Sequence, residues 1–137
     1  MRLLIPLPHL KQVEADARAR APIEACGILI GKRGKNDFEV LDLVAAPNVV
    51  DSPTRFEIDP EELYRVMKGA EARRLEIIGF YHSHLGYGAG PSAVDLEHMK
   101  FLSNLVWLIC DILARSAEFK AFSMHGGKLV ELELVTI

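Results

Sequence analysis

Two long apolar runs constrain the fold of this chain more than any other feature. They are EIIGFYHSH at residues 76–84 and LVWLICDI at residues 105–112. Both are mostly apolar and contain β-branched and aromatic residues, which is typical of central strands buried on both faces. Helices must cover such a sheet, because an open face would expose apolar side chains to water. We therefore expect an α/β or α+β fold with these two strands near its centre.

Shorter patterns predict the elements around this pair, in the order helix, strand, strand, helix, strand, helix and three strands. The predictions rest on apolar residues at helical spacing, on residues typical of helix starts and on alternation around tight turns. The expected elements are a helix over 8–20, a hairpin of strands 26–32 and 38–46, a loop over 47–57, a helix opened by Asp59 and Pro60, a helix from near Ser92, and a hairpin of strands 117–124 and 128–135.

The second and third helices should pack an apolar face on the sheet. The residues expected at these faces are Leu63, Val66, Met67 and Ala70 in one helix and Leu96, Met99, Phe101 and Leu102 in the other. Tyr64 is also expected to pack, and Trp107 is expected in the core.

Composition predicts one globular domain over residues 1–137. The chain has 137 residues, of which 50% are hydrophobic, and a formal net charge of −3. This charge gives no general attraction to nucleic acid, and no apolar stretch reaches the roughly 18 residues of a membrane span. We expect a cytoplasmic protein without nucleic-acid or membrane partners, whose oligomeric state stays open. Cys26 and Cys110 lie in apolar segments and are expected to be buried thiols, while their pairing stays open.

Two histidines, one residue apart, end the first apolar run. Side chains two positions apart on a strand point to the same face, so His82 and His84 project together if the strand reaches residue 84. Two imidazoles on one face form half of a tetrahedral zinc site. An H-x-H pair alone is a weak signal, because strands carry two such histidines by chance.

Ser92 and Asp95 open a helix directly after a glycine-rich loop. If the loop folds the chain back, Asp95 lies over the end of the strand and becomes a third, anionic ligand. The same spacing predicts a capping box, in which Ser92 caps the helix and Asp95 reaches back to its amide. The two interpretations are compatible, because the positive end of a helix dipole keeps a carboxylate ionised.

Three protein ligands leave the fourth position of a catalytic zinc ion to water, whose pKa the ion lowers to about 7. A hydrolase also needs a general base and a donor to the developing oxyanion, and Ser92 is a candidate for that donor. Spacing does not identify the base, and the candidates on composition are Glu24, Glu57, Glu61, Glu62, Glu76 and Glu97. The motif H-E-x-x-H, the zinc deaminase signature, the phosphate-binding loop and the G-x-S-x-G elbow are absent from the sequence.

The spacing of these residues resembles the JAMM (MPN+) metalloprotease family. Its pattern H-x-H-x7-S-x-x-D matches the chain from His82 to Asp95 without a misfit. The segment EACGILIG, residues 24–31, resembles the first-strand motif that begins with the catalytic glutamate of the family. Residues 48–62 resemble the loop and the start of the helix that follow. The resemblance implies a curled mixed β-sheet flanked by helices, in a three-layer sandwich similar to cytidine deaminases.

The resemblance also implies a role for each matching residue. His82, His84 and Asp95 would bind one catalytic zinc ion. Glu24 would be the general base for the metal-activated water, and Ser92 would stabilise the tetrahedral intermediate.

The implied reaction is hydrolysis of the isopeptide or peptide bond after the C-terminal Gly-Gly of a ubiquitin-like or sulfur-carrier protein. The alternatives are a peptidase that releases a single amino acid, such as cysteine, from a sulfur-carrier protein, and a non-catalytic scaffold module. The chain resembles the short archaeal and bacterial members, because the insertion that eukaryotic relatives carry after the aspartate looks absent. Leu85 stands where the family usually has proline, which leaves the order of the following loop open.

Two further residues have candidate roles. His98 follows Asp95 by one helical turn, so it is either a partner of a metal ligand or a residue of the helix surface. Tyr87 lies in the glycine-rich loop and is a candidate for substrate contact.

Overall fold

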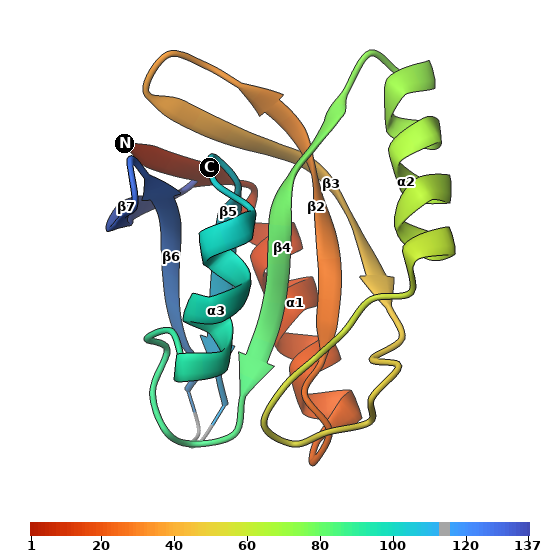
Figure 1. The fold of residues 1–137 in the computed structure, drawn as a ribbon, viewed down its shortest axis with the longest axis vertical. Coiled ribbons are helices and arrows are strands. Elements are labelled where there is room, and N and C mark those ends of the chain that lie inside the picture. Colours follow the sequence, from red (N-terminus) through yellow and green to blue (C-terminus); the bar gives the residue numbers. More distant parts are fainter. Residues whose placement is uncertain (113–115) are drawn as a thin grey trace.

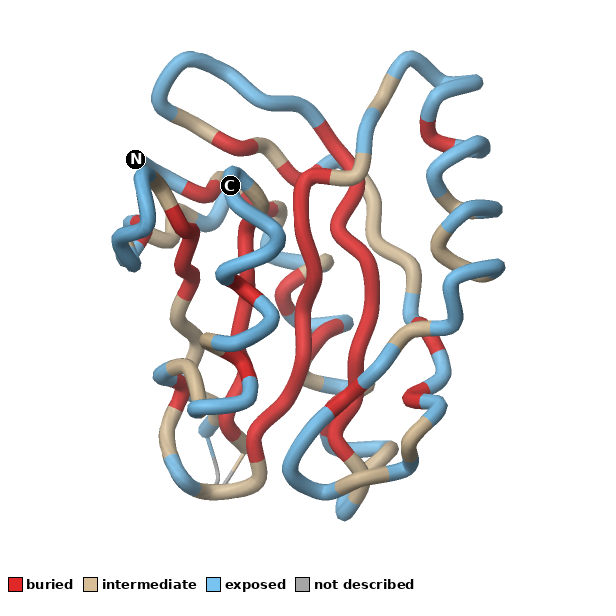
Figure 2. The backbone as a smooth tube through the Cα atoms, viewed as in Figure 1, coloured by how far each residue is buried: buried red, intermediate tan, exposed pale blue. Residues whose placement is uncertain are grey.

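The computed structural model describes residues 1–112 and 116–137, and at its centre β4 (Glu76–His84) pairs in parallel with β5 (Val106–Asp111). On its other side β4 pairs antiparallel with β2 (Cys26–Arg33). All of β5 and all but the first two residues of β4 are buried, and Figure 2 shows the buried stretch that runs along β2 and β4. The prediction of two central strands is confirmed.

The described residues contain seven strands, which close into a barrel in the order β1-β3-β2-β4-β5-β6-β7. The second antiparallel partner of β2 is β3 (Asp37–Ala46), and the last two strands are the hairpin of β6 (Glu118–His125) and β7 (Lys128–Thr136). Parallel and antiparallel pairs both occur, so the curled mixed sheet flanked by helices is confirmed. The three-layer sandwich and the likeness to cytidine deaminases stay predictions.

The strand that closes the barrel is absent from the elements predicted above. β1 (Arg2–Ile5) pairs in parallel with both β3 and β7. Its side chains Leu3 and Ile5 are fully buried in the core. The run RLLI is too short to show a strand period, and Pro6 follows it directly, so only the partners of β1 reveal it as a strand.

Helices cover the sheet from both sides. α1 (Leu7–Arg20) buries Leu10 and Val13 in one core cluster, behind β2 and β4 in Figure 1. α2 (Pro60–Ala72) and α3 (Ala93–Phe101) contribute Ala70 and Met99 to the cluster on the opposite face. No helix in the described ranges is long and apolar enough to cross a membrane.

The packing predicted for α2 and α3 is wrong at several positions. Ala70 and Met99 are buried as expected, but Tyr64 is 59% exposed and Phe101 is 84% exposed. Met67 and Leu102 are exposed as well. Helical spacing tells which side chains share a face, but not how far the neighbouring sheet extends beneath them. Phe101 is the last residue of its helix.

Both cysteines are free and fully buried, as expected of core thiols. Cys26 lies in β2 and Cys110 in β5. Burial raises the pKa of each thiol to about 12, so both stay protonated near neutral pH.

Gly79→Ala should destabilise the fold, whereas Gly69→Ala should not. A Cβ at Gly79 in β4 would lie 2.0 Å from the carbonyl oxygen of Val106 in β5, and backbone paired in a sheet cannot move aside cheaply. At Gly69 in α2 a Cβ meets nothing within 4 Å. We expect a loss of about 2 kcal/mol or more for the first variant and a gain of about 0.5–1 kcal/mol for the second, which replaces glycine inside a helix. Urea unfolding of both variants measures the difference, and equal midpoints would contradict it.

Candidate metal centre and active site

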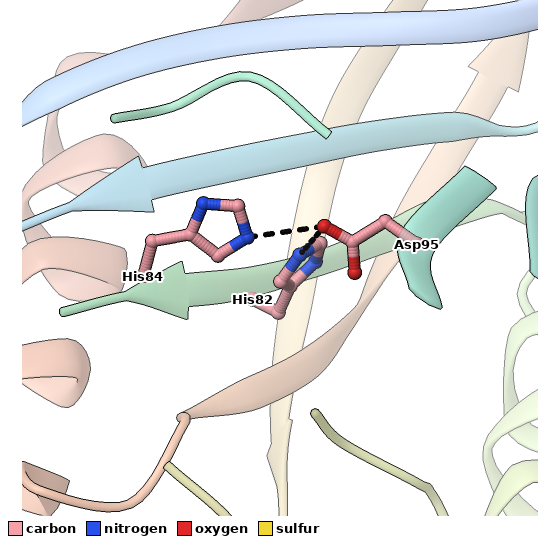
Figure 3. Close-up of side chains that lie close together, drawn as sticks. All are labelled: His82, His84 and Asp95. Carbon is pink, nitrogen blue, oxygen red and sulfur yellow. Dashed lines mark hydrogen bonds and ion pairs between the residues drawn. The ribbon is translucent and has the colours of Figure 1, made fainter. Parts of the chain in front are cut away.

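Three buried side chains converge at the end of β4. Nε2 of His82 lies 3.1 Å and Nε2 of His84 lies 3.0 Å from the same oxygen, Oδ2 of Asp95. One ligand atom from each residue lies within 4.8 Å of the others. Figure 3 shows both imidazoles projecting from β4 toward the carboxylate at the start of α3. The three residues predicted as ligands are thus brought together.

The strand geometry explains why both histidines face Asp95. β4 persists to His84, so His82 and His84 share a face and Ser83 points to the other. Ser83 is tied to the segment before β2, because its Oγ accepts from the amide of Ala25 at 2.7 Å and its amide donates to the carbonyl of Ala25 at 3.0 Å. At the end of β4, one face therefore carries the two imidazoles, and the other face anchors Ala25, the residue next to Glu24.

The start of α3 forms a capping box and also contributes the third side chain of the cluster, Asp95. The amide of Asp95 donates to Oγ of Ser92 at 3.0 Å, and the amide of Ser92 donates to Oδ2 of Asp95 at 2.9 Å. The cap therefore fixes the carboxylate oxygen that faces the two imidazoles. The expectation that capping and clustering are compatible agrees with this geometry.

The hydrogen bonds around His84 indicate that a positive charge belongs in the cluster. Nδ1 of His84 lies 2.7 Å from the carbonyl oxygen of Gly88, which only accepts, so Nδ1 carries the hydrogen. In a neutral ring Nε2 then presents a lone pair to the carboxylate of Asp95. Two acceptors at this distance repel unless a proton or a metal cation lies between them, and neutral imidazoles with a carboxylate are ligands that zinc prefers.

The electrostatics of the cluster favour an ionised Asp95. Burial alone would raise the pKa of Asp95, but the hydrogen bonds that His82 and His84 donate when Nε2 carries a proton outweigh it and hold the pKa far below its usual value. Burial lowers the pKa of His82, which favours the neutral ring that a metal requires. Despite the burial of His84, its hydrogen bond to Asp95 raises its pKa, so a proton on His84 balances the anion in the metal-free protein, and a divalent cation would take the place of that proton.

Glu24 is the buried acid next to this cluster. It is fully buried just before β2, and its Oε1 has no hydrogen-bond partner in the described structure. Its Oε2 accepts from the hydroxyl of Tyr87 at 3.1 Å. Burial, followed by the negative charge of Asp95, raises the pKa of Glu24 to about 7. A buried carboxylate with a free oxygen and this pKa has the properties of a general base.

The remaining glutamates considered for the base lie in different environments. Glu62 is half-buried at the start of α2, and Glu57, Glu61, Glu76 and Glu97 are exposed. Burial beside the cluster therefore favours Glu24 among the candidates that composition left open.

Several residues of the site escaped the sequence analysis. The ring of Phe56 stacks on His82 with centroids 4.6 Å apart. Asp111 accepts a hydrogen bond from the amide of Gly86 at 2.8 Å. Asp111 is the one acid in the apolar run at residues 105–112, and that position was the available signal. His98 is exposed and meets Phe56 edge to face at 6.5 Å, so it belongs to the helix surface.

Comparisons with known proteins agree on one family. Residues 6–125 match the family described as prokaryotic homologs of the JAB domain. The chain is 34% identical over 134 residues to a desampylase of Pyrococcus furiosus, covering 97% of this chain and 89% of the relative. It is 32% identical over 95 residues to a CysO-cysteine peptidase of Mycobacterium tuberculosis, covering 69% and 64% of the two chains. A solution structure from Desulfitobacterium hafniense superposes with a TM-score of 0.88 at 28% identity, covering 98% of this chain and 92% of the other.

Glu24→Gln should stabilise the metal-free protein at neutral pH and above, but not in acid. The folded chain raises the pKa of Glu24 from 4.5 to about 7. The protonated side chain is therefore compatible with folding below pH 4.5, and stability is lost as the pH rises through about 7, because the folded chain must then bury a charge. Glutamine has no charge to bury. We expect the free energy of unfolding to rise by roughly 1–3 kcal/mol at about pH 8, with little change at about pH 4. Urea unfolding with a chelator measures both, and equal effects at the two pH values would contradict the raised pKa.

Proposed function

Because the chain belongs to the prokaryotic homologues of the JAB domain, within the JAMM (MPN+) family, we propose that it is a zinc-dependent peptidase or isopeptidase. Its substrate would be the bond that follows the C-terminal Gly-Gly of a ubiquitin-like or sulfur-carrier protein. The observation that carries this proposal is the convergence of three buried ligand side chains beside a buried glutamate with a free oxygen.

His82, His84 and Asp95 would hold the metal through two nitrogens and one oxygen. This donor set suits zinc, and three protein ligands leave a position for a small molecule. A zinc ion in this position would acidify a water molecule and polarise the scissile carbonyl. The capping box would keep the carboxylate of Asp95 turned toward both imidazoles throughout.

Glu24 would move the protons of the reaction. Oε1 of Glu24 has no hydrogen-bond partner among the described residues, so it would be available to accept a proton from the attacking water and to return that proton to the leaving amine. A pKa of about 7 suits both transfers, because the carboxylate takes up and releases a proton near neutral pH.

Ser92 would stabilise the negative charge that develops on the substrate oxygen. Its Oγ already accepts from the amide of Asp95, which leaves the hydroxyl hydrogen available for donation. The hydroxyl lies at the start of α3 beside the cluster, where a helix N-terminus also favours negative charge.

A Gly-Gly tail would reach this cluster of buried side chains more easily than larger residues would, because glycine has no side chain. An added strand at a sheet edge, in which the tail pairs with the main chain, needs an unpaired strand. The described strands form a closed barrel, in which β1 leaves the part of β3 beyond Glu39 without a second partner, and β2 separates that part of β3 from β4. The tail would therefore run across the end of β4, close to Phe56 in the loop before α2.

Release of a single amino acid is the second candidate function. The relative named CysO-cysteine peptidase supports it, and its chemistry requires the same base and ligands with a smaller leaving group. A non-catalytic scaffold is less well supported, because nothing would select for a buried ligand cluster beside Glu24 in such a module. Metal analysis separates the scaffold from both peptidase candidates, since a scaffold should contain no stoichiometric zinc.

Glu24→Gln should abolish cleavage while zinc stays bound. Glutamine keeps the size of the side chain and the acceptor for Tyr87, but it cannot accept a proton. We expect kcat to fall by about 10²-fold or more, which is typical for the loss of a general base. Glu97→Gln is the matched control, because this exposed glutamate contacts only Lys100 among the described residues. Turnover rates and zinc content of both variants test the assignment, and unchanged turnover for Glu24→Gln would refute it.

Cleavage of a fusion panel should depend on metal. The panel would contain ubiquitin-like and sulfur-carrier proteins that end in Gly-Gly and are linked to a reporter protein, to lysine or to cysteine. We expect cleavage after the second glycine, its loss with a chelator and its return with added zinc. Product masses identify the bond, and cleavage of the cysteine adduct alone would favour the second candidate. Full activity in the metal-stripped protein would contradict the proposed mechanism.

A further inference from the structure

The glycine-rich loop that links β4 to α3 is anchored by two acids of the neighbouring strands. Asp111 accepts from the amide of Gly86 at 2.8 Å and also from the amide of Gly88. Glu118 accepts from the amide of Ala89 at 2.9 Å. Hydrogen bonds to a charged acceptor are stronger than those to a neutral one. These two acids therefore order a loop whose glycine content would otherwise make it flexible.

Two glycines of this loop have backbone angles that other residues rarely adopt. φ is 111° at Gly86 and 96° at Gly88. Tyr87 lies between them, and the amides on either side of it are held by Asp111. The position of Tyr87 is therefore set mainly by its neighbours in the loop, because the residue itself is 51% exposed.

Tyr87 contacts both halves of the candidate site. Its hydroxyl donates to Oε2 of Glu24 at 3.1 Å. Its ring stacks on the imidazole of His84, with centroids 4.3 Å apart and an interplanar angle of 26°. One half-exposed side chain thus links the candidate base to a candidate metal ligand.

We propose that Tyr87 is a positioning residue that acts through Glu24 and His84. The carboxylate of Glu24 can rotate about its last bond, and a donor at Oε2 selects the orientation that leaves Oε1 free to meet the attacking water. The ring packs on one face of His84 while Gly88 accepts from its Nδ1, and together these contacts direct Nε2 toward Asp95. This inference rests on the proposed hydrolase function and adds a residue to it.

The two contacts of Tyr87 can be tested separately. Tyr87→Phe removes the hydroxyl and keeps the ring, so we expect kcat to fall about tenfold, with KM and zinc affinity within about twofold of the wild type. Tyr87→Ala also removes the ring, so we expect the same loss of kcat and about tenfold weaker zinc binding, as is common when the support of a ligand is lost. Tyr64→Phe is the matched control, because Tyr64 lies exposed on α2, away from the cluster.

The measurements are kcat and KM on a Gly-Gly fusion that the wild type cleaves, and zinc affinity by competition with a chromogenic chelator. The zinc measurement needs no turnover, so it reports on His84 independently of activity. Wild-type kcat in Tyr87→Phe would overturn the role at Glu24, and wild-type zinc affinity in Tyr87→Ala would overturn the role at His84. A higher kcat in either variant would show that Tyr87 obstructs the site, which also contradicts the proposal. A wild type that cleaves no fusion would instead refute the proposed function.

Discussion

The site depends on one carboxylate oxygen, Oδ2 of Asp95, that is buried between two imidazoles. It accepts from the amide of Ser92 and faces Nε2 of both His82 and His84. A buried charge is costly unless it is paired, and the hydrogen on Nδ1 of His84 leaves the opposite nitrogen as an acceptor. The folded chain therefore requires a positive charge at this position, either a proton on an imidazole or a metal cation. That requirement is the physical link between the fold and hydrolytic chemistry.

The sheet brings the other functional groups to the same place through strand register. β2 pairs antiparallel with β4, with Cys26 opposite His82, so the segment before β2 reaches the end of β4 where the histidines lie. β5 pairs in parallel with β4 on the other side and places Asp111 opposite His84. The candidate base thus comes from the segment that leads into β2, and the anchor of the glycine-rich loop comes from β5.

The sequence predicted those parts of the molecule that depend on local spacing. The bounds of β4 follow from an apolar run, and the shared face of His82 and His84 follows from the two-residue period of a strand. Parts that depend on the choice of partner were not predictable in the same way. β1 becomes a strand only because β3 and β7 lie beside it, and nothing near Glu24 indicates that Tyr87 will donate to it. Only the family resemblance distinguished Glu24 from the other glutamates before the structure showed its burial.

With Leu85 in place of the proline usual in the family, this chain orders its glycine-rich loop by other means. Proline would restrict the backbone of its own residue and of the one before it, but it would not orient the carbonyl of Gly88. That carbonyl is oriented because the amide of Ala89, which belongs to the same planar peptide unit, donates to Glu118. The glycines that make the loop flexible are also the residues that can adopt its positive φ angles. Carboxylates on β5 and β6 therefore supply the order, and the geometry of the cluster is maintained with leucine in this position.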